Sequence, residues 1–268
     1  MIDITQDQLG MSAHEDADIK KPWQFRPWAV KGHLRHFFDQ LLLIDHWRYL
    51  YMKLRFIYFV KIKRKLSYLD LVTGDIAKET VQHNIKGLID VSVTRSNTLV
   101  KPLSAIESLD INSKILSIGP RTEGELYNLT ANGFKIENIR GLDLISYSPL
   151  IDLGDMHEMP YKNDQWDAII CGWVLAYSDN KQKAAEELIR CCRPGGIIAV
   201  GIEYHPRSDE EIVKATGYLP GSDERLKSIQ HIQKLFNGHI DHIYFSQQPV
   251  PEKRDEIGSI VLIFSVKK

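Results

Sequence analysis

Short, wholly apolar runs alternate with amphipathic stretches through the second half of the chain. Runs such as 168–170 and 197–200 carry no polar residue, which is typical of strands that are buried on both faces. The pattern predicts strands at 114–118, 138–143, 151–153, 167–171, 197–202, 240–246 and 258–266, and helices at 123–131, 181–192 and 223–236. This alternation predicts a mostly parallel sheet with helices on both faces.

The last two predicted strands are joined differently from the others. Only residues 247–257, which include Pro249 and Pro251, separate them, and this is too few for a helical crossover. They should therefore pair antiparallel. We expect an α/β fold that is doubly wound around a mostly parallel seven-stranded sheet, with an antiparallel last strand and an N-terminal helical appendage.

The N-terminal part of the chain shows a different organisation. Its beginning lacks periodicity, and three helical patterns follow at 33–66, 73–86 and 100–109. We expect three regions, namely a flexible leader at 1–22, a helical region at 23–110 and the α/β domain at 111–268.

Residues 45–65 combine six aromatic side chains with seven basic ones, and Asp45 is the only acidic residue there. This helix could pack on the main domain or on a second subunit as a homodimer contact, or it could lie on an anionic membrane surface. The pattern favours packing. The apolar run is interrupted by Lys53 and Arg55 and falls short of the roughly 20 residues that a spanning helix needs.

Composition narrows the class of protein further. The 268 residues are 43% hydrophobic, which allows a substantial core, and the net charge of −1 leaves no global basic field for nucleic acid. The three cysteines, Cys171, Cys191 and Cys192, suit a reducing interior, and no metal-ligand spacing surrounds them. The polar, acidic N-terminus does not resemble a secretory signal, so we expect a cytoplasmic protein without a metal site.

The turn that follows the predicted strand 114–118 is the first candidate for a ligand site. The apolar run breaks at Gly119 and a helical pattern opens at Glu123. Because the first N–H groups of a helix have no partner of their own, α/β proteins place ligands at such turns. The sequence therefore predicts a bound small molecule.

Other candidates follow the carboxyl ends of the neighbouring strands, where doubly wound sheets bind ligands. Asp143 can accept hydrogen bonds from the hydroxyls of a ribose, or it simply terminates its strand. Asp155 can accept from the exocyclic amine of a purine with Met156 against the ring, although Gly154-Asp155 is also a common turn pair.

The succession of these segments resembles the class I S-adenosylmethionine-dependent methyltransferases, in the branch that acts on small molecules and glycans. The resemblance covers residue 112 to the C-terminus and rests on five ordered segments. They are Ile115-Leu-Ser-Ile-Gly119, Gly141-Leu-Asp143, Gly154-Asp155-Met-His-Glu-Met-Pro160, Asp164-Gln-Trp-Asp-Ala-Ile-Ile170 and Arg193-Pro-Gly-Gly196. The resemblance implies a Rossmann-like methyltransferase fold, S-adenosylmethionine as cofactor, and a lid near 92–101.

The resemblance also implies roles for matching positions. The turn Gly119, Pro120, Arg121 would approach the methionine part of the cofactor, Asp143 with its neighbour Leu144 the ribose, and Asp155 with Met156 the adenine. Gly172 and Trp173 would wall the cavity beside the sulfonium.

Three departures from the family pattern bear on the cofactor site. Ser117 stands where the first strand usually carries an acidic residue, and Pro120, Arg121 and Glu123 replace the usual glycines. Arg121 could pair with the cofactor's carboxylate and Glu123 with its ammonium group, or the two could form a surface ion pair. Only 12 positions separate Asp143 from Asp155, too few for the usual crossover helix, so a face is left for the N-terminal helices or a partner to cover.

Methyl transfer to a hydroxyl needs an aligned acceptor and a base, and His205 is the best candidate for the base because it follows the fifth strand at the ligand edge. Tyr177, Tyr204 and His157 are weaker candidates. The sequence predicts an S-adenosylmethionine-dependent methyltransferase that acts on oxygen of a small polar molecule or a saccharide. The alternative is a catalytically inactive binding or scaffolding protein that has kept the fold.

Overall fold

The computed structural model describes residue 37, residues 40–69, residue 88, residues 95–216 and residues 225–268. All of these except residue 37 belong to one unit, Gln40–Lys268. The predicted leader at 1–22 and the predicted helix at 73–86 lie outside the described residues, as does the first part of the predicted lid.

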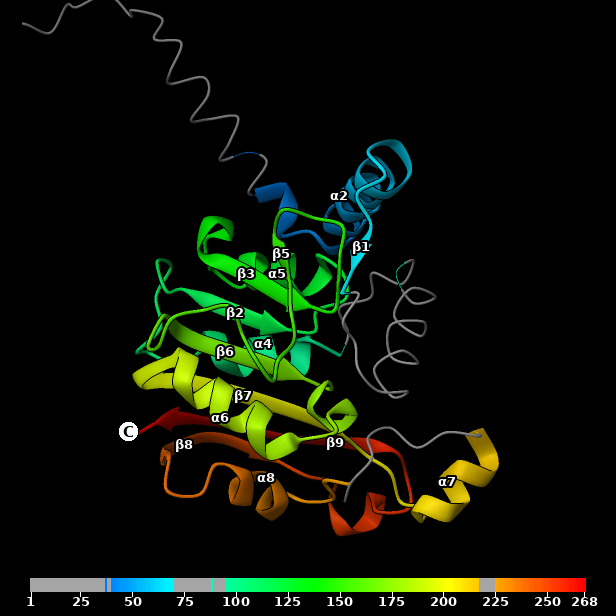
Figure 1. Ribbon diagram of the computed structural model, residues 1–268, viewed down its shortest axis with the longest axis vertical. Helices are drawn as coiled ribbons and strands as arrows, with labels where there is room; N and C mark the ends of the chain where they lie inside the picture. Colours follow the sequence, from blue (N-terminus) through cyan, green and yellow to red (C-terminus); the bar gives the residue numbers. More distant parts are fainter. Residues whose placement is uncertain (1–36, 38–39, 70–87, 89–94, 217–224) are drawn as a thin grey trace, which may run out of the picture. The chain divides into compact units, whose positions relative to one another are not determined.

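A seven-stranded sheet forms the centre of this unit, with the strand order β5-β3-β2-β6-β7-β9-β8 (Figure 1). The pairs from β5 to β7 are parallel, whereas β9 is antiparallel to both of its neighbours. The strands are β2 Ile115–Ile118, β3 Ile139–Asp143, β5 Ile151–Leu153, β6 Trp166–Gly172, β7 Cys192–Tyr204, β8 Ile240–Gln247 and β9 Gly258–Val266. The predicted fold class is confirmed, and the last strand is inserted between β7 and β8.

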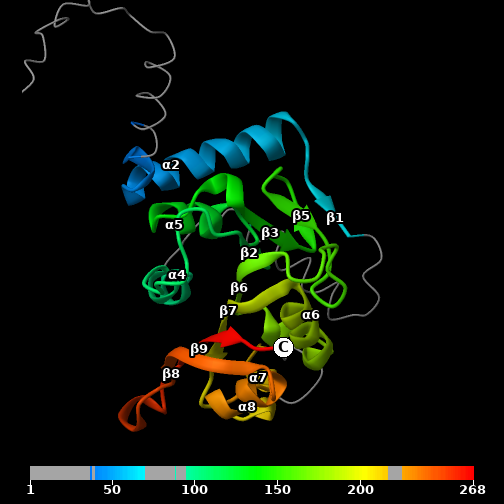
Figure 2. The ribbon, with the colours of Figure 1, turned by 90° about the vertical axis from the view of Figure 1, so that its left-hand side faces the viewer.

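Helices cover both faces of the sheet, as Figure 2 shows. One core cluster includes Leu188 of α6 and Ile232 of α8, and the other includes Leu99 of α4 and Leu126 of α5. The helices are α4 Asn97–Ser104, α5 Gly124–Ala131, α6 Lys181–Cys191, α7 Asp209–Thr216 and α8 Ile229–Leu235, with 3₁₀ turns η2 Ile136–Asn138, η3 Leu175–Tyr177 and η4 Pro251–Lys253.

The helix boundaries differ from the prediction at three places. The predicted helix 100–109 begins earlier, at Asn97, and ends at Ser104. In the described part of the predicted helix 223–236, the helix is limited to α8, because the hydroxyl of Ser228 accepts a hydrogen bond from the backbone N–H of His231 and so caps the helix there. Helix α7 was not predicted.

The predicted helix at 33–66 corresponds in its described part to α2 Asp45–Phe56 and a π-helical continuation, η1 Ile57–Ile62. Helix α2 packs on the unit through two edge-to-face ring pairs, Tyr51 with Tyr127 at 5.3 Å and Phe56 with Tyr147 at 5.5 Å between centroids. Packing on the main domain is thus confirmed for one face of this helix.

The connection between β3 and β5 contains no helix, as the spacing of the sequence predicts. It contains only a short strand, β4 Ile145–Ser146, which pairs antiparallel with β1 Ser67–Tyr68. The side chains of Phe56, Phe59 and Val60 pack against the core cluster that contains Tyr147 and Ile151. The N-terminal helix thus packs beside α5 at the end of the sheet formed by β3 and β5 (Figure 2).

No helix among the described residues is long and apolar enough to cross a bilayer. The three cysteines are buried and unpaired.

Candidate functional site

The turn after β2 has an unusual backbone. Gly119 has a φ of 64° and Arg121 a φ of 55°, so both lie in the left-handed region. A Cβ at Gly119 would fall 2.2 Å from Cγ1 of Val174, so no larger residue fits there. Arg121 has no such freedom, and this conformation costs a non-glycine residue on the order of 1 kcal/mol. The chain thus keeps a glycine-like turn at a position where it has an arginine.

Asp143 holds this turn in place from the end of β3. Its carboxylate accepts the backbone N–H of Arg121 at 2.8 Å and that of Ile145 at 3.2 Å, and the residue is only 4% exposed. Burial raises the pKa of Asp143 to about 6, although these hydrogen bonds favour its charged form. Asp143 therefore ties the ends of β2 and β3 together.

Glu123 points away from this turn and toward the N-terminal helix. Its two carboxylate oxygens accept a bidentate pair of hydrogen bonds from Arg55, at 2.6 and 2.7 Å, and one of them also accepts the hydroxyl of Ser148. Its backbone N–H donates to the hydroxyl of Tyr147 at 3.0 Å. The carboxylate that the sequence assigned to the cofactor's ammonium group is thus engaged in a buried ion pair.

A different carboxylate, that of Glu125, is hydrogen-bonded to the serine of β2. The hydroxyl of Ser117 on β2 donates a hydrogen bond to Glu125, which comes from the first turn of α5. A Cβ on Gly172 would lie 3.7 Å from the second oxygen of Glu125, so this carboxylate sits between the ends of β2 and β6. Desolvation raises the pKa of Glu125 to about 7. The sequence analysis missed Glu125, and only the unexpected serine in the strand pointed to it.

Asp155 and His157 form a hydrogen-bonded chain with a serine. The Nδ1 atom of His157 lies 2.6 Å from Oδ1 of Asp155, and its Nε2 lies 2.6 Å from Oγ of Ser178. The hydrogen bond with His157 lowers the pKa of Asp155. Ser178 is 1% exposed, so no substrate reaches its hydroxyl, and the chain fastens the loop after β5 to the segment after η3. Met156 packs on the core beside it.

The residues after β6 form the next part of the same edge. Trp173 also lies in the left-handed region, with a φ of 59°. Its backbone N–H donates to the carbonyl of Gly201 at 2.7 Å. The guanidinium of Arg95 lies 5.3 Å from the centroid of the Trp173 ring and pairs with Glu203 at 3.1 Å. This places an exposed ion pair beside a buried aromatic wall.

His205 lies on the rim of this edge and is partly exposed. Its Nδ1 accepts the backbone N–H of Arg207 at 3.2 Å. In the neutral ring, Nε2 then carries the proton, so this tautomer donates a hydrogen bond at Nε2 and cannot accept one there.

Two further predicted residues have structural contacts. Pro120 would meet a Cβ on Gly141 of β3 at 2.7 Å, so it packs directly on that strand. The carbonyl of Leu144 accepts the N–H of Leu69 at 3.0 Å, beside the pairing of β1 with β4.

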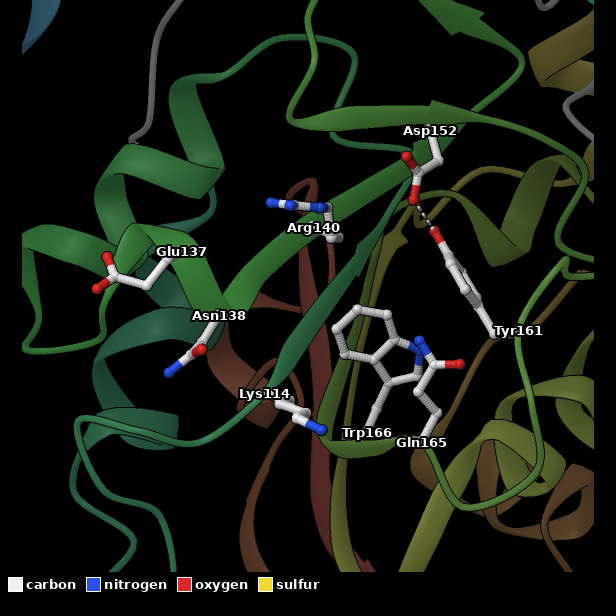
Figure 3. Close-up of a pocket in the computed structure, with 8 residues that line it drawn as sticks. All are labelled: Lys114, Glu137, Asn138, Arg140, Asp152, Tyr161, Gln165 and Trp166. Carbon is white, nitrogen blue, oxygen red and sulfur yellow. Dashed lines mark hydrogen bonds between the residues drawn. The ribbon is translucent and has the colours of Figure 1, made fainter.

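The opposite, amino edge of the sheet carries an open cavity of about 260 Å³ (Figure 3). The hydroxyl of Tyr161 donates to Asp152 at 2.8 Å, and its ring packs edge-to-face on Trp166, whose Nε1 is buried without a partner. The lining residues are Lys114, Glu137, Asn138, Arg140, Asp152, Tyr161, Gln165 and Trp166. Lys114, Asn138 and Gln165 directly precede β2, β3 and β6, so this cavity is separate from the predicted cofactor edge.

Residues 130–200 match the family model described as "Methyltransferase domain". Solved structures with the same fold include a chain of the complex of the Haloferax volcanii Trm112 methyltransferase activator, at 13% identity and a TM-score of 0.55, covering 72% of this chain and 97% of that one. The structure of the [4+2]-cyclase SpnF matches at 14% identity and a TM-score of 0.51, covering 75% of this chain and 98% of that one. The MccD protein matches at 14% identity and a TM-score of 0.51, covering 64% of this chain and 96% of that one. At these identities the likeness shows the fold.

Among curated proteins, an uncharacterized protein of Mycobacterium tuberculosis and one of Mycobacterium bovis are each 40% identical over 42 residues. The matched segment spans 16% of this chain and only 15% of each relative. Residues 130–200 thus match a methyltransferase domain, and the strand order is that of a Rossmann-like methyltransferase fold.

Proposed function

We propose that the chain is an active methyltransferase that binds S-adenosylmethionine at the carboxyl edge of β2, β3, β5 and β6. The observation that carries this proposal is the backbone of Arg121. It keeps a left-handed conformation that favours glycine, and Asp143 fixes its N–H. A chain that had lost the cofactor would have little reason to retain this strained turn.

The residues of this edge suit the parts of the cofactor. Gly119 and Pro120 would border its methionine part, and the guanidinium of Arg121 would pair with the methionine carboxylate. We assign the methionine ammonium group to Glu125 instead of Glu123, because Glu123 is paired with Arg55 and Glu125 lies beside Gly172.

Residues further along the same edge would bind the ribose and the adenine. Each oxygen of the Asp143 carboxylate has two lone pairs, so it can accept a ribose hydroxyl in addition to a backbone N–H. Leu144 would lie beside the ribose. The Asp155 side chain is 43% exposed and would accept the exocyclic amine, with Met156 against the ring.

Bound S-adenosylmethionine would supply a methyl group on its sulfonium. The acceptor would take this methyl group by in-line displacement, with S-adenosylhomocysteine as the leaving group. The chain's own contribution is to align the acceptor and to exclude water with Gly172 and Trp173. The pair Arg95–Glu203 offers both a donor and an acceptor to a polar molecule at the rim. We infer that the acceptor is a hydroxyl of a small polar molecule or a saccharide. We infer further that His205 takes its proton at Nε2, which requires the ring to give up the Nδ1 hydrogen bond with the N–H of Arg207 and to carry its own proton on Nδ1.

One observation favours a non-catalytic alternative, in which the fold is kept as a binding module. Asp143 is almost fully buried and both of its oxygens already have backbone partners. The fold alone does not decide this question, since a solved structure with the same fold is described as a cyclase.

Calorimetric titration with S-adenosylmethionine and S-adenosylhomocysteine separates the two functions. We expect saturable binding and a rise of the melting temperature, both strongly reduced in Asp143→Ala and retained in Asp152→Asn at the opposite edge. Absence of heat and of a thermal shift at millimolar ligand would establish the binding module instead.

A further inference from the structure

Helix α2 and its continuation η1 expose a row of large apolar side chains to solvent. Six of them are between 45% and 66% exposed, and we call this set the α2 stripe. It consists of Trp47, Leu50, Leu54, Ile57, Tyr58 and Ile62. Contiguous apolar surface of this kind is uncommon on a protein that has no partner at that surface.

The α2 stripe is not the face by which the helix packs on the unit. Arg48 and Met52 are buried and Phe56 joins the core, whereas Trp47, Leu50 and Leu54 lie on the other side of the helix, because residues three and four apart share a face. The helix is therefore apolar on two opposite faces, and within the described part of the unit only one of them is covered.

Basic residues flank the exposed face without acidic neighbours. Lys61, Lys63, Arg64 and Lys65 are all exposed, and residues 46–66 contain no Asp or Glu. The remaining basic residues of the helix include Arg48 and Arg55, which pair with Asp45 and Glu123. The four exposed cations lie at the C-terminal end of the α2 stripe.

We propose that the α2 stripe binds an anionic membrane surface, with its apolar side chains in the interfacial layer and the four cations on lipid headgroups. Tryptophan and tyrosine suit this layer because one end of each is apolar and the other polar. Charge complementarity favours an anionic surface over a second copy of the chain, because the exposed cations of residues 61–65 have no acidic residue within 46–66 to complement them. Each basic residue adds attraction to an anionic bilayer.

The test is co-sedimentation of the full chain with vesicles of phosphatidylglycerol and phosphatidylcholine, in low and high salt. We expect binding to the anionic vesicles that weakens at least tenfold in 0.5 M salt, because ions screen the headgroups, and no binding to pure phosphatidylcholine. Absence of binding to anionic vesicles in low salt overturns the proposal.

Matched variants locate the contact. Leu54→Asp should lower binding at least tenfold, whereas Ile257→Asp, at an equally exposed position, should leave it unchanged. The triple variant Lys61→Glu, Lys63→Glu, Lys65→Glu should abolish it. The triple variant Lys162→Glu, Lys214→Glu, Lys253→Glu, with the same change of net charge, should retain most of it. Equal losses in both triple variants would show attraction by net charge alone and would overturn the assignment.

Sedimentation velocity without lipid tests the other occupant. A dimer that Leu54→Asp converts to a monomer, in a protein that ignores anionic vesicles, would assign the α2 stripe to a second copy. These readouts do not depend on cofactor binding, so their failure leaves the proposed methyltransferase function untouched.

Discussion

The two edges of the central sheet differ in the burial of their polar side chains. At the amino edge the polar side chains line an open cavity, and Lys114 and Glu137 are exposed. At the carboxyl edge the acidic side chains Glu123 and Asp143 are buried, and each has specific partners. Burial makes these interactions strong and their loss costly. The open cavity therefore lies at the edge opposite to the one that holds the buried, hydrogen-bonded carboxylates.

The largest effect should come from breaking the buried ion pair. Arg55→Ala leaves the Glu123 carboxylate, which is 1% exposed, without its cation, so we expect unfolding free energy to fall by about 3 kcal/mol in urea titrations. Arg55→Lys should restore part of this loss, because it keeps the charge but not the bidentate geometry. A loss below about 1 kcal/mol would mean that the pair is effectively solvated.

Asp143→Ala should have the next largest effect, on cofactor affinity. It removes an acceptor for ribose and frees the N–H of Arg121, so we expect S-adenosylmethionine binding to weaken about 100-fold, which corresponds to about 2.7 kcal/mol. Asp143→Asn keeps one oxygen and should lose less. Equal affinity in all three proteins would exclude Asp143 from the cofactor site.

Glu125 should make cofactor binding depend on pH. Its pKa of about 7 means that it is protonated in much of the free protein below neutrality, whereas an ammonium group binds only the carboxylate. Affinity should therefore fall about tenfold from pH 8 to pH 6. Calorimetry on Glu125→Gln should give a weaker and flat profile, and a wild-type profile without slope would contradict the assignment.

The same group should affect stability in the opposite direction. Because its folded pKa lies above its ordinary value of 4.5, the folded protein binds more protons between about pH 4.5 and 7. Its contribution to unfolding free energy thus falls as pH rises through this window. Glu125→Gln should remove that part of the slope and leave the part due to Asp143, whose pKa is also raised.

Arg121→Gly sharpens the comparison by separating strain from binding. Glycine relieves the left-handed backbone, so we expect stability to rise by about 1 kcal/mol, while loss of the guanidinium should weaken cofactor binding about tenfold. Tighter binding in the variant would show that Arg121 obstructs the site.

The smallest effect is expected at the amino edge. Asp152→Asn weakens a single, partly exposed hydrogen bond with Tyr161, so unfolding free energy should change by less than about 1 kcal/mol and cofactor binding not at all. A large effect of this variant on cofactor binding would mean that the cofactor binds at the amino edge, and it would contradict our proposal.

The sheet could be predicted from the sequence because β2, β6 and β7 are buried on both faces and appear as apolar runs with clear ends. Helix α7 could not, since it is only eight residues long and its first turn holds Asp209, Glu210 and Glu211. The hydrophobic pattern reveals an element through the apolar side chains that it buries. A short and mostly polar surface helix has few such side chains, so the pattern does not reveal it.

Within the candidate site, the strand ends were predictable but the pairing of charges was not. The partners Arg55 and Glu123 are 68 residues apart, and no local pattern links them. Glu125 reaches back to Ser117 across a turn, so a carboxylate of the following helix lies beside the serine of the strand. Sequence spacing places residues at an edge, but it does not say which way each side chain turns.

Because the connection from β3 to β5 contains no helix, truncation of the N-terminal segment has a structural consequence. A protein beginning at residue 95 would retain all seven strands, yet it would strip Phe56, Phe59 and Val60 from the core and leave Glu123 without Arg55. We therefore expect a fragment whose boundary is drawn from the sheet alone to be much less stable than the chain that includes α2 and η1.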